Sequence, residues 1–164
     1  MKKVKLGFVG AGFNGQIGFL ENFSKNKNCT IFGLAEYRKK LRSKVSKKYN
    51  ITNQYSSHKD LEKDIKKYDG IVIVTKRHMM PAITYDFLKF RKPILSEKPM
   101  AMCSQQGKKL LKRSQKYKTQ YKVGYNKIYD EGIIKAKKAF DKINKNKSLG
   151  KIVFIRSHRL SGSG

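Results

Sequence analysis

The chain has 164 residues, enough for one complete domain with a buried core and part of a second. No apolar run approaches the ~20 residues that a membrane-spanning helix requires, and no secretory signal precedes the first predicted strand. Cys29 and Cys103 lack the spacing of metal ligands or redox pairs, so we expect reduced thiols, a cytoplasmic protein and no metal site.

The strongest compositional feature is a basic excess. Lysine and arginine total 39 against 11 acidic residues, a formal net charge of +28. Such an excess is compatible with binding to nucleic acid or another polyanion. The basic residues are nevertheless spread along the whole chain, mostly on predicted helix faces. We therefore favour a solvated, lysine-rich surface and expect neither a nucleic-acid nor a membrane partner, with polyanion binding left open as an alternative.

The first 36 residues contain the most informative pattern. An apolar strand from Lys3 to Gly10 runs into Gly10-Ala11-Gly12-Phe13-Asn14-Gly15, which matches G-x-G-x-x-G. A helix predicted from Phe13 to Lys25 follows, and then a second strand from Cys29 to Ala35 that ends on Glu36. Strand, glycine turn, helix, strand and acid in this order are the fingerprint of a dinucleotide-binding fold.

Each glycine of the motif has a physical task. Gly10 lets the chain turn sharply, Gly12 lets the backbone approach a pyrophosphate, and Gly15 lets the helix pack closely on the strand. The start of the helix then offers unpaired N–H groups and a positive dipole end to the phosphates.

The acid at the end of the second strand bears on the choice of cofactor. Glu36 follows Gly15 by 21 residues, the distance at which an acid accepts hydrogen bonds from the adenosine ribose. It would repel a 2′-phosphate, so we expect NAD to be preferred over NADP. Arg38 and Lys39 lie close enough in sequence to soften that preference.

The alternation of strands and helices continues to residue 125. It predicts an α/β fold with a doubly wound parallel sheet, a Rossmann domain over residues 1–125. The later helices are predicted at Tyr37–Tyr49, Asp60–Lys67, Pro81–Phe90 and Ser104–Tyr117, and the later strands near Tyr55 and at Asp69–Thr75, Pro93–Ser96 and Thr119–Tyr125. Beyond them, a helix at Lys127–Asn144 and a strand at Ile152–Arg156 suggest that residues 126–164 begin a second, α+β domain that is incomplete.

A second motif, Glu97-Lys98-Pro99, closes the strand that begins at Pro93. From its spacing alone, an ordinary charged turn is the favoured interpretation. Together with the glycine loop, Glu36 and the Ile71–Thr75 strand, however, it resembles the Gfo/Idh/MocA oxidoreductases. The segment Leu149–Val153 is similar to the family's entry into its second domain.

The resemblance implies an NAD- or NADP-dependent enzyme that moves a hydride to or from a hydroxyl-bearing carbon of a sugar or cyclitol. Lys98 would be the catalytic lysine that contacts the reacting hydroxyl, with Glu97 helping to position it. The Lys98–Pro99 bond is expected to be cis. The implied cofactor-binding residues are Gly10, Gly12, Phe13, Asn14, Gly15, Glu36, Arg38, Thr75 and Glu97.

The chain also departs from the family pattern. Thr75-Lys76 stands where the family often has Thr-Pro, and the downstream Asp and His that complete the family's active site are not found in these 164 residues. We therefore expect the N-terminal part of a longer enzyme, catalytically incomplete alone, whose second domain binds substrate and supports a homo-oligomer. The alternative is a stand-alone dinucleotide-binding module without turnover.

Overall fold

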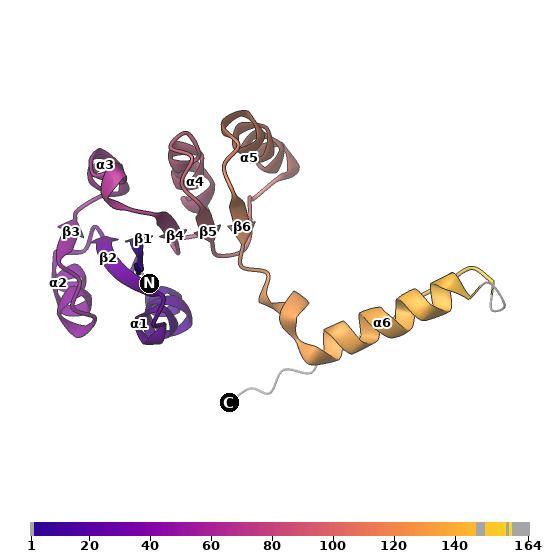
Figure 1. Ribbon diagram of the computed structural model, residues 1–164. Helices are drawn as coiled ribbons and strands as arrows, with labels where there is room; N and C mark the ends of the chain where they lie inside the picture. The colour runs from indigo at the N-terminus through magenta and orange to yellow at the C-terminus, as the bar shows by residue number, and fades with distance from the viewer. Residues whose placement is uncertain (1, 147–149, 157, 159–164) are drawn as a thin grey trace. The chain divides into compact units, whose positions relative to one another are not determined.

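The computed structural model describes residues 2–146, 150–156 and 158, and divides into two compact units, Met1–Gly124 and Tyr125–Gly164. The first unit is built on six parallel strands (Figure 1). They are β1 (Val4–Val9), β2 (Cys29–Ala35), β3 (Asn53–Tyr55), β4 (Gly70–Ile73), β5 (Ile94–Ser96) and β6 (Tyr121–Val123).

The order of the strands defines the topology. It runs β3-β2-β1-β4-β5-β6, so the chain moves outward from β1 in one direction and then returns to β4 on the other side of β1. The predicted doubly wound parallel sheet is therefore confirmed. The point where the direction reverses lies between β1 and β4, and ligands of open parallel sheets bind beyond the carboxyl ends of the strands at such a point.

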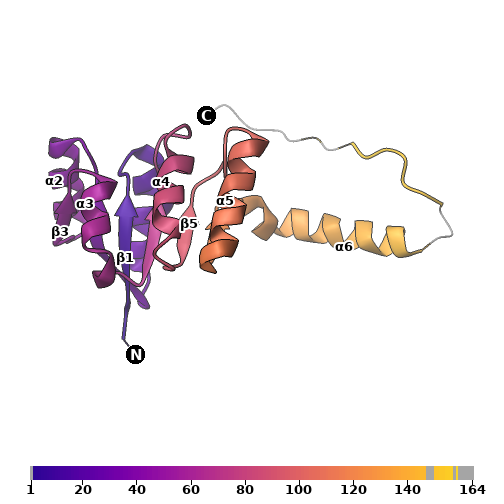
Figure 2. The same cartoon turned by 90° about the horizontal axis from the view of Figure 1, so that it is seen from above.

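Helices cover both faces of this sheet. The helix that follows the glycine loop is wound as a π-helical turn, η1 (Gly15–Leu20), before it continues as α1. Figure 1 shows α1 and α2 on one face, and Figures 1 and 2 show α3, α4 and α5 side by side on the other. The bounds are α1 (Glu21–Lys25), α2 (Lys39–Lys48), α3 (His58–Lys63), the short 3-10 turn η2 (Ile65–Lys67), α4 (Met80–Leu88) and α5 (Ser104–Tyr117).

Each face of the sheet has its own apolar core. One cluster joins the sheet to α3, α4 and α5 and contains the fully buried Tyr68 and Phe87. The other joins it to the helices of the opposite face and contains Phe8 and Leu20. Burial of such side chains contributes roughly 1.5–3 kcal/mol each, so the two clusters fix the sheet between its helix layers. Among the described helices, none combines the length and apolarity that crossing a bilayer requires.

The ring of Tyr68 is accommodated by glycines in the strands beneath it. A Cβ atom on Gly33 of β2 would lie 2.1 Å from the Tyr68 hydroxyl oxygen, and one on Gly7 of β1 would lie 3.1 Å from the ring. The Tyr68 hydroxyl donates to Tyr55 Oη at 2.8 Å, which in turn donates to Asp64 Oδ2 at 2.8 Å. This chain of hydrogen bonds satisfies a buried hydroxyl that would otherwise be costly.

The second unit consists of η3 (Asn126–Tyr129) and α6 (Glu131–Lys145) among its described residues. The Asp130 carboxylate caps α6 by accepting hydrogen bonds from the backbone N–H groups of Gly132 and Ile133. The predicted strand at Ile152–Arg156 is wrong, because the structure assigns no strand to these residues. A strand needs a neighbouring strand to pair with, and the described part of the chain provides none there.

We expect Gly33→Ala to lower the free energy of unfolding by about 1–3 kcal/mol, the usual cost of overpacking a core. The added methyl group would force Tyr68 out of its site and strain its hydrogen bond to Tyr55. Gly18→Ala is the matched control, since a Cβ at Gly18 meets no atom within 4 Å. Urea unfolding followed by circular dichroism measures both, and equal midpoints for the two variants would contradict this account.

Candidate functional site

A cavity of about 620 Å³ lies at the carboxyl edge of the sheet. Its walls come from the segments that follow β1, β2, β3, β4 and β5, which the parallel topology brings to one edge. Every site residue predicted from the sequence is among its lining residues. These are Gly10, Gly12, Phe13, Asn14, Gly15, Glu36, Arg38, Thr75, Glu97 and Lys98.

The three glycines of the loop differ in the space that a side chain would find at each position. Gly10 has a φ of +96°, and a Cβ there would lie 2.2 Å from the carbonyl oxygen of Val74. A Cβ on Gly15 would lie 3.1 Å from the Gly10 carbonyl oxygen. A Cβ on Gly12, by contrast, meets no protein atom within 4 Å. The fold itself therefore requires Gly10 and Gly15, whereas the space beside Gly12 is open for a ligand.

The Glu36 side chain ties the glycine loop to the end of β2. It is only 4% exposed, and its carboxylate accepts four N–H groups. The backbone N–H groups of Ala11 and Arg38 each donate at 3.0 Å. The Arg38 guanidinium adds Nε at 2.9 Å and Nη2 at 3.0 Å. Arg42 Nη1 also donates to the Glu36 carbonyl oxygen at 2.6 Å.

These hydrogen bonds decide the charge state of the carboxylate. Burial by itself would raise the pKa of Glu36, but the hydrogen bonds from the Arg38 side chain and from the backbone of Arg38 and Ala11 outweigh it and lower the pKa. Glu36 is therefore ionised at neutral pH, and Arg38 neutralises it within the cavity wall.

The remaining predicted site residues follow β4 and β5. After β4, the hydroxyl of Thr75 is buried and has no hydrogen-bond partner among the described residues. After β5, the Glu97 backbone N–H donates to the Ile73 carbonyl oxygen at 2.9 Å, and the Lys98 backbone N–H donates to the Glu97 carboxylate. The Lys98–Pro99 bond is cis, as expected, and the Lys98 side chain is exposed at the cavity.

These features fit a dinucleotide. The open space beside Gly12 suits a pyrophosphate, and Thr75 lines the same cavity. Glu36 lies at the end of the second strand, where the adenosine ribose binds in dinucleotide folds. The lining residues would therefore hold the cofactor along the carboxyl edge of the sheet.

The structure adds lining residues that the sequence did not single out. Lys76 and Arg77 follow Thr75 and add two cations to the wall, while His78 is not among the lining residues. Residues Ser56, Ser57 and His58 after β3 also line the cavity. Their positions directly after β3 and β4 are the signal that could have identified them, because ligands of parallel sheets bind at strand ends.

One cluster near the cavity has the composition of a metal site. Within the described residues, the ligand atoms of His58, Glu62 and Asp86 lie within 4.8 Å of one another. Both carboxylates are already paired, Asp86 with Lys59 at 2.8 Å and Glu62 with Lys89 at 3.5 Å. We therefore interpret the cluster as an ion-pair network that joins α3 to α4.

Comparison with known families decides the identity of this fold. The family profile described as an oxidoreductase family with an NAD-binding Rossmann fold matches residues 4–125, well over half of the chain. The chain belongs to the Gfo/Idh/MocA oxidoreductase family. Membership confirms the predicted fold class and the nicotinamide dinucleotide cofactor, whereas the preference for NAD over NADP stays a prediction. A search of curated protein sequences finds no match.

Solved structures share the fold of this Gfo/Idh/MocA chain. The scyllo-inositol dehydrogenase of Lactobacillus casei, crystallised with NAD(H) and scyllo-inositol, is 18% identical with a TM-score of 0.79 over 88% of this chain. The myo-inositol 2-dehydrogenase of Lactobacillus plantarum is 20% identical with a TM-score of 0.78 over 93%. A Clostridium difficile dehydrogenase is 24% identical with a TM-score of 0.71 over 88%. The alignments cover only 42%, 44% and 44% of those proteins, respectively.

We expect Gly12→Val to weaken NADH binding by about tenfold or more, because the side chain would fill the space that suits the pyrophosphate. The fold should tolerate the change, since no protein atom lies within 4 Å of a Cβ there. Gly18→Val is the matched control, a glycine of the helix that follows the loop, which has equal free space and does not line the cavity. Fluorescence titration with NADH measures both, and an unchanged affinity in Gly12→Val would refute this role.

The Glu36 hydrogen bonds should also make stability depend on pH. Because the folded-state pKa lies below the ordinary value of 4.5, the contribution is complete above that value and is lost as the pH falls through the lowered pKa. Glu36→Gln should therefore cost about 1–2 kcal/mol at neutral pH and progressively less in acid. Urea unfolding of both proteins across the acid range tests this, and a pH-independent difference would contradict it.

Proposed function

We propose that this chain is the cofactor-binding part of a dehydrogenase that transfers a hydride to or from a hydroxyl-bearing carbon. The observation that carries the proposal is the convergence of the glycine loop, Glu36 and Lys98 on one cavity, although they come from three separate strand ends. The nicotinamide supplies the hydride chemistry when it is bound. The protein supplies the binding groups and the polar groups around the reacting carbon.

Lys98 is the proposed catalytic residue. Its side chain is exposed and belongs to the cavity wall, so the ammonium group is free to reach a substrate hydroxyl and polarise it. Glu97 has a positioning role in this proposal, which the hydrogen bond from the Lys98 backbone N–H to its carboxylate supports. The base that takes the hydroxyl proton is, by family resemblance, an Asp or His of the second domain.

A sugar or cyclitol is the proposed substrate. The Lactobacillus casei relative was crystallised with scyllo-inositol, and the Lactobacillus plantarum relative is a myo-inositol dehydrogenase. Both are similar to this chain in fold over most of its length, which supports a polyol substrate here. The free thiols Cys29 and Cys103 support the proposal of a reducing, cytoplasmic location.

Residues 126–164 are proposed to begin the domain that binds substrate and supports oligomer formation. Helix α6 has an apolar stripe but buries none of its residues, and Ile133 and Ile143 are 50% and 44% exposed. An amphipathic helix gains most of its stability from packing that stripe against a partner. The exposed stripe of α6 thus supports a larger second domain.

We expect the 164-residue chain to bind NADH but to form little or no NADH from NAD with scyllo-inositol or myo-inositol. Hydride transfer requires the substrate in a near-attack geometry, and the proposal assigns that task to the second domain. Absorbance of reduced nicotinamide measures turnover, with a full-length inositol dehydrogenase as the positive control. Robust turnover would refute the expected incompleteness, and failure to bind NADH would refute the proposed function itself.

A further inference from the structure

Acidic residues are unevenly distributed over the face of the sheet that carries α3, α4 and α5, which lie side by side (Figures 1 and 2). On α3 and α4, the carboxylates of Asp60, Glu62 and Asp86 each form an ion pair with a lysine of α3. Helix α5 packs on α4 but contains no acidic residue, and in the described part of the chain no ion pair involves its basic residues. The fold therefore balances the charges of α3 and α4 and leaves those of α5 unbalanced.

The basic residues of α5 form what we call the α5 surface, which consists of Lys108, Lys109, Lys112, Arg113 and Lys116. All of its lysines are exposed. Lys108, Lys112 and Lys116 follow one another at intervals of four residues, so they lie in a row on one side of the helix, about 6 Å apart along its axis. Like charges at this spacing destabilise a helix, and α5 has no acid that offsets the repulsion. A row of negative charges laid along the helix would relieve it.

The guanidinium of Arg113 is held in place by its neighbours on α4 and α5. Its Nε donates to the Tyr85 carbonyl oxygen at 2.8 Å. Its Cζ lies 3.9 Å from the centroid of the Tyr85 ring and 5.1 Å from that of Tyr117. None of the described hydrogen bonds uses the Nη1 or Nη2 atom of this residue. A guanidinium that is already fixed loses little freedom when its remaining N–H groups bind a phosphate.

The buried side of α5 decides which polyanion the surface suits. Leu110 is 2% exposed and belongs to the apolar cluster between the sheet and its helices. A helix that binds a membrane inserts its apolar side among the lipids, and that side of α5 is occupied by the core. A nucleic acid requires only the exposed cations, because its backbone is a linear row of phosphates. The charges and packing of α5 therefore favour a nucleic acid over an anionic membrane.

We propose that the α5 surface binds the phosphate backbone of a nucleic acid without preference for its sequence. The lysine row contacts successive phosphates, and Arg113 binds one of them through its Nη1 and Nη2 atoms. Contacts with phosphates position a nucleic acid but carry no sequence information directly. The inference does not rest on the proposed function, since no residue of the α5 surface lines the cavity.

The test measures binding of fluorescein-labelled single-stranded oligonucleotides of about 20 nucleotides, in two unrelated sequences, by fluorescence anisotropy at several salt concentrations. One variant combines Lys108→Gln, Lys112→Gln and Lys116→Gln. Its matched control removes the same charge from α2, on the opposite face of the sheet, by combining three substitutions of exposed lysines, Lys40→Gln, Lys44→Gln and Lys47→Gln. Circular dichroism checks that both triple variants keep the fold.

We expect the wild type to bind both oligonucleotides with similar affinity. The α5 triple variant should lose about tenfold or more in affinity at low salt. Its slope of log K against log salt concentration should fall by about 2, because each phosphate contact on a single strand contributes about 0.7. The α2 triple variant should stay within about threefold of the wild type and keep its slope, since it loses only long-range attraction. Arg113→Lys should also weaken binding, because it keeps the charge but loses the paired donors.

Four results would overturn the inference. An α5 triple variant that binds as the wild type does would exclude the lysine row, and an unchanged affinity in Arg113→Lys would exclude the role of its guanidinium. An equal loss in the α2 triple variant would show an effect of general charge. A wild type that binds vesicles of phosphatidylserine and phosphatidylcholine but neither oligonucleotide would assign the surface to a membrane. In each case the binding of NADH, measured separately, still decides the proposed function.

Discussion

The hydrogen bond from the Ala11 N–H to the buried Glu36 carboxylate is the contact on which the site depends. It ties the glycine loop to the end of β2, so two segments that are distant in sequence form one wall of the cavity. A carboxylate this deeply buried remains ionised only because N–H groups and the Arg38 guanidinium surround it. The geometry of the loop and the electrostatics of this wall are therefore set by the same residue.

The sheet behind this wall is held rigid by close packing. Tyr68 fills the space above β1 and β2 that glycines leave open, and its hydroxyl is satisfied through Tyr55 and Asp64. Close packing of this kind leaves few ways for the strand ends to move relative to one another. The loops that carry the cavity residues thus start from fixed positions, which suits a site that must hold an extended ligand.

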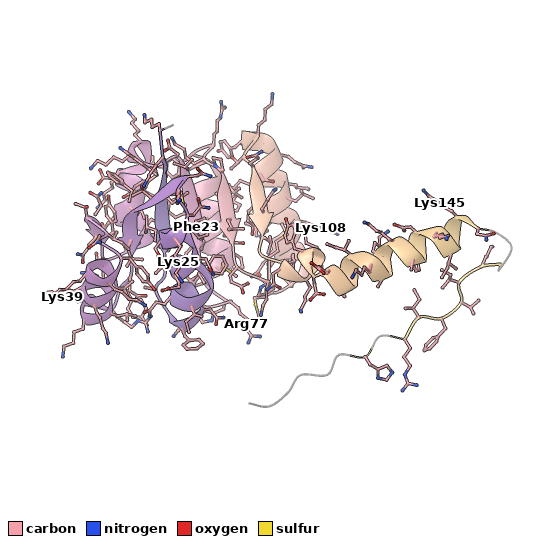
Figure 3. All side chains as sticks on the ribbon, turned by 60° about the horizontal axis from the view of Figure 1, so that its bottom comes forward. Phe23, Lys25, Lys39, Arg77, Lys108 and Lys145 are labelled. Atoms are coloured by element: carbon pink, nitrogen blue, oxygen red, sulfur yellow. The ribbon has the colours of Figure 1, made fainter. Side chains whose placement is uncertain are left out.

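The basic residues of the surface differ in their surroundings from those that line the cavity. Acidic residues such as Asp60 and Asp64 each pair with a neighbouring lysine, and long basic side chains project from the surface around the chain (Figure 3). Lys39, Lys108 and Lys145 lie on three different helices, α2, α5 and α6, so the basic residues are not confined to one element. In the cavity, by contrast, Arg38 is paired with Glu36, and Lys98 belongs to the wall.

The sequence by itself determined the class of sheet, the glycine loop and the ten predicted site residues that line the cavity. These follow from local rules: hydrophobic periodicity, the special conformation of Gly10, and the convergence of parallel strands at one edge. Only the tertiary structure decided that Arg38 covers Glu36, and that Ile152–Arg156, apolar and β-branched as it is, forms no strand. A hydrogen bond between side chains depends on the rotamers and neighbours of both, and a strand depends on a partner. Neither is encoded in the local pattern that a sequence displays.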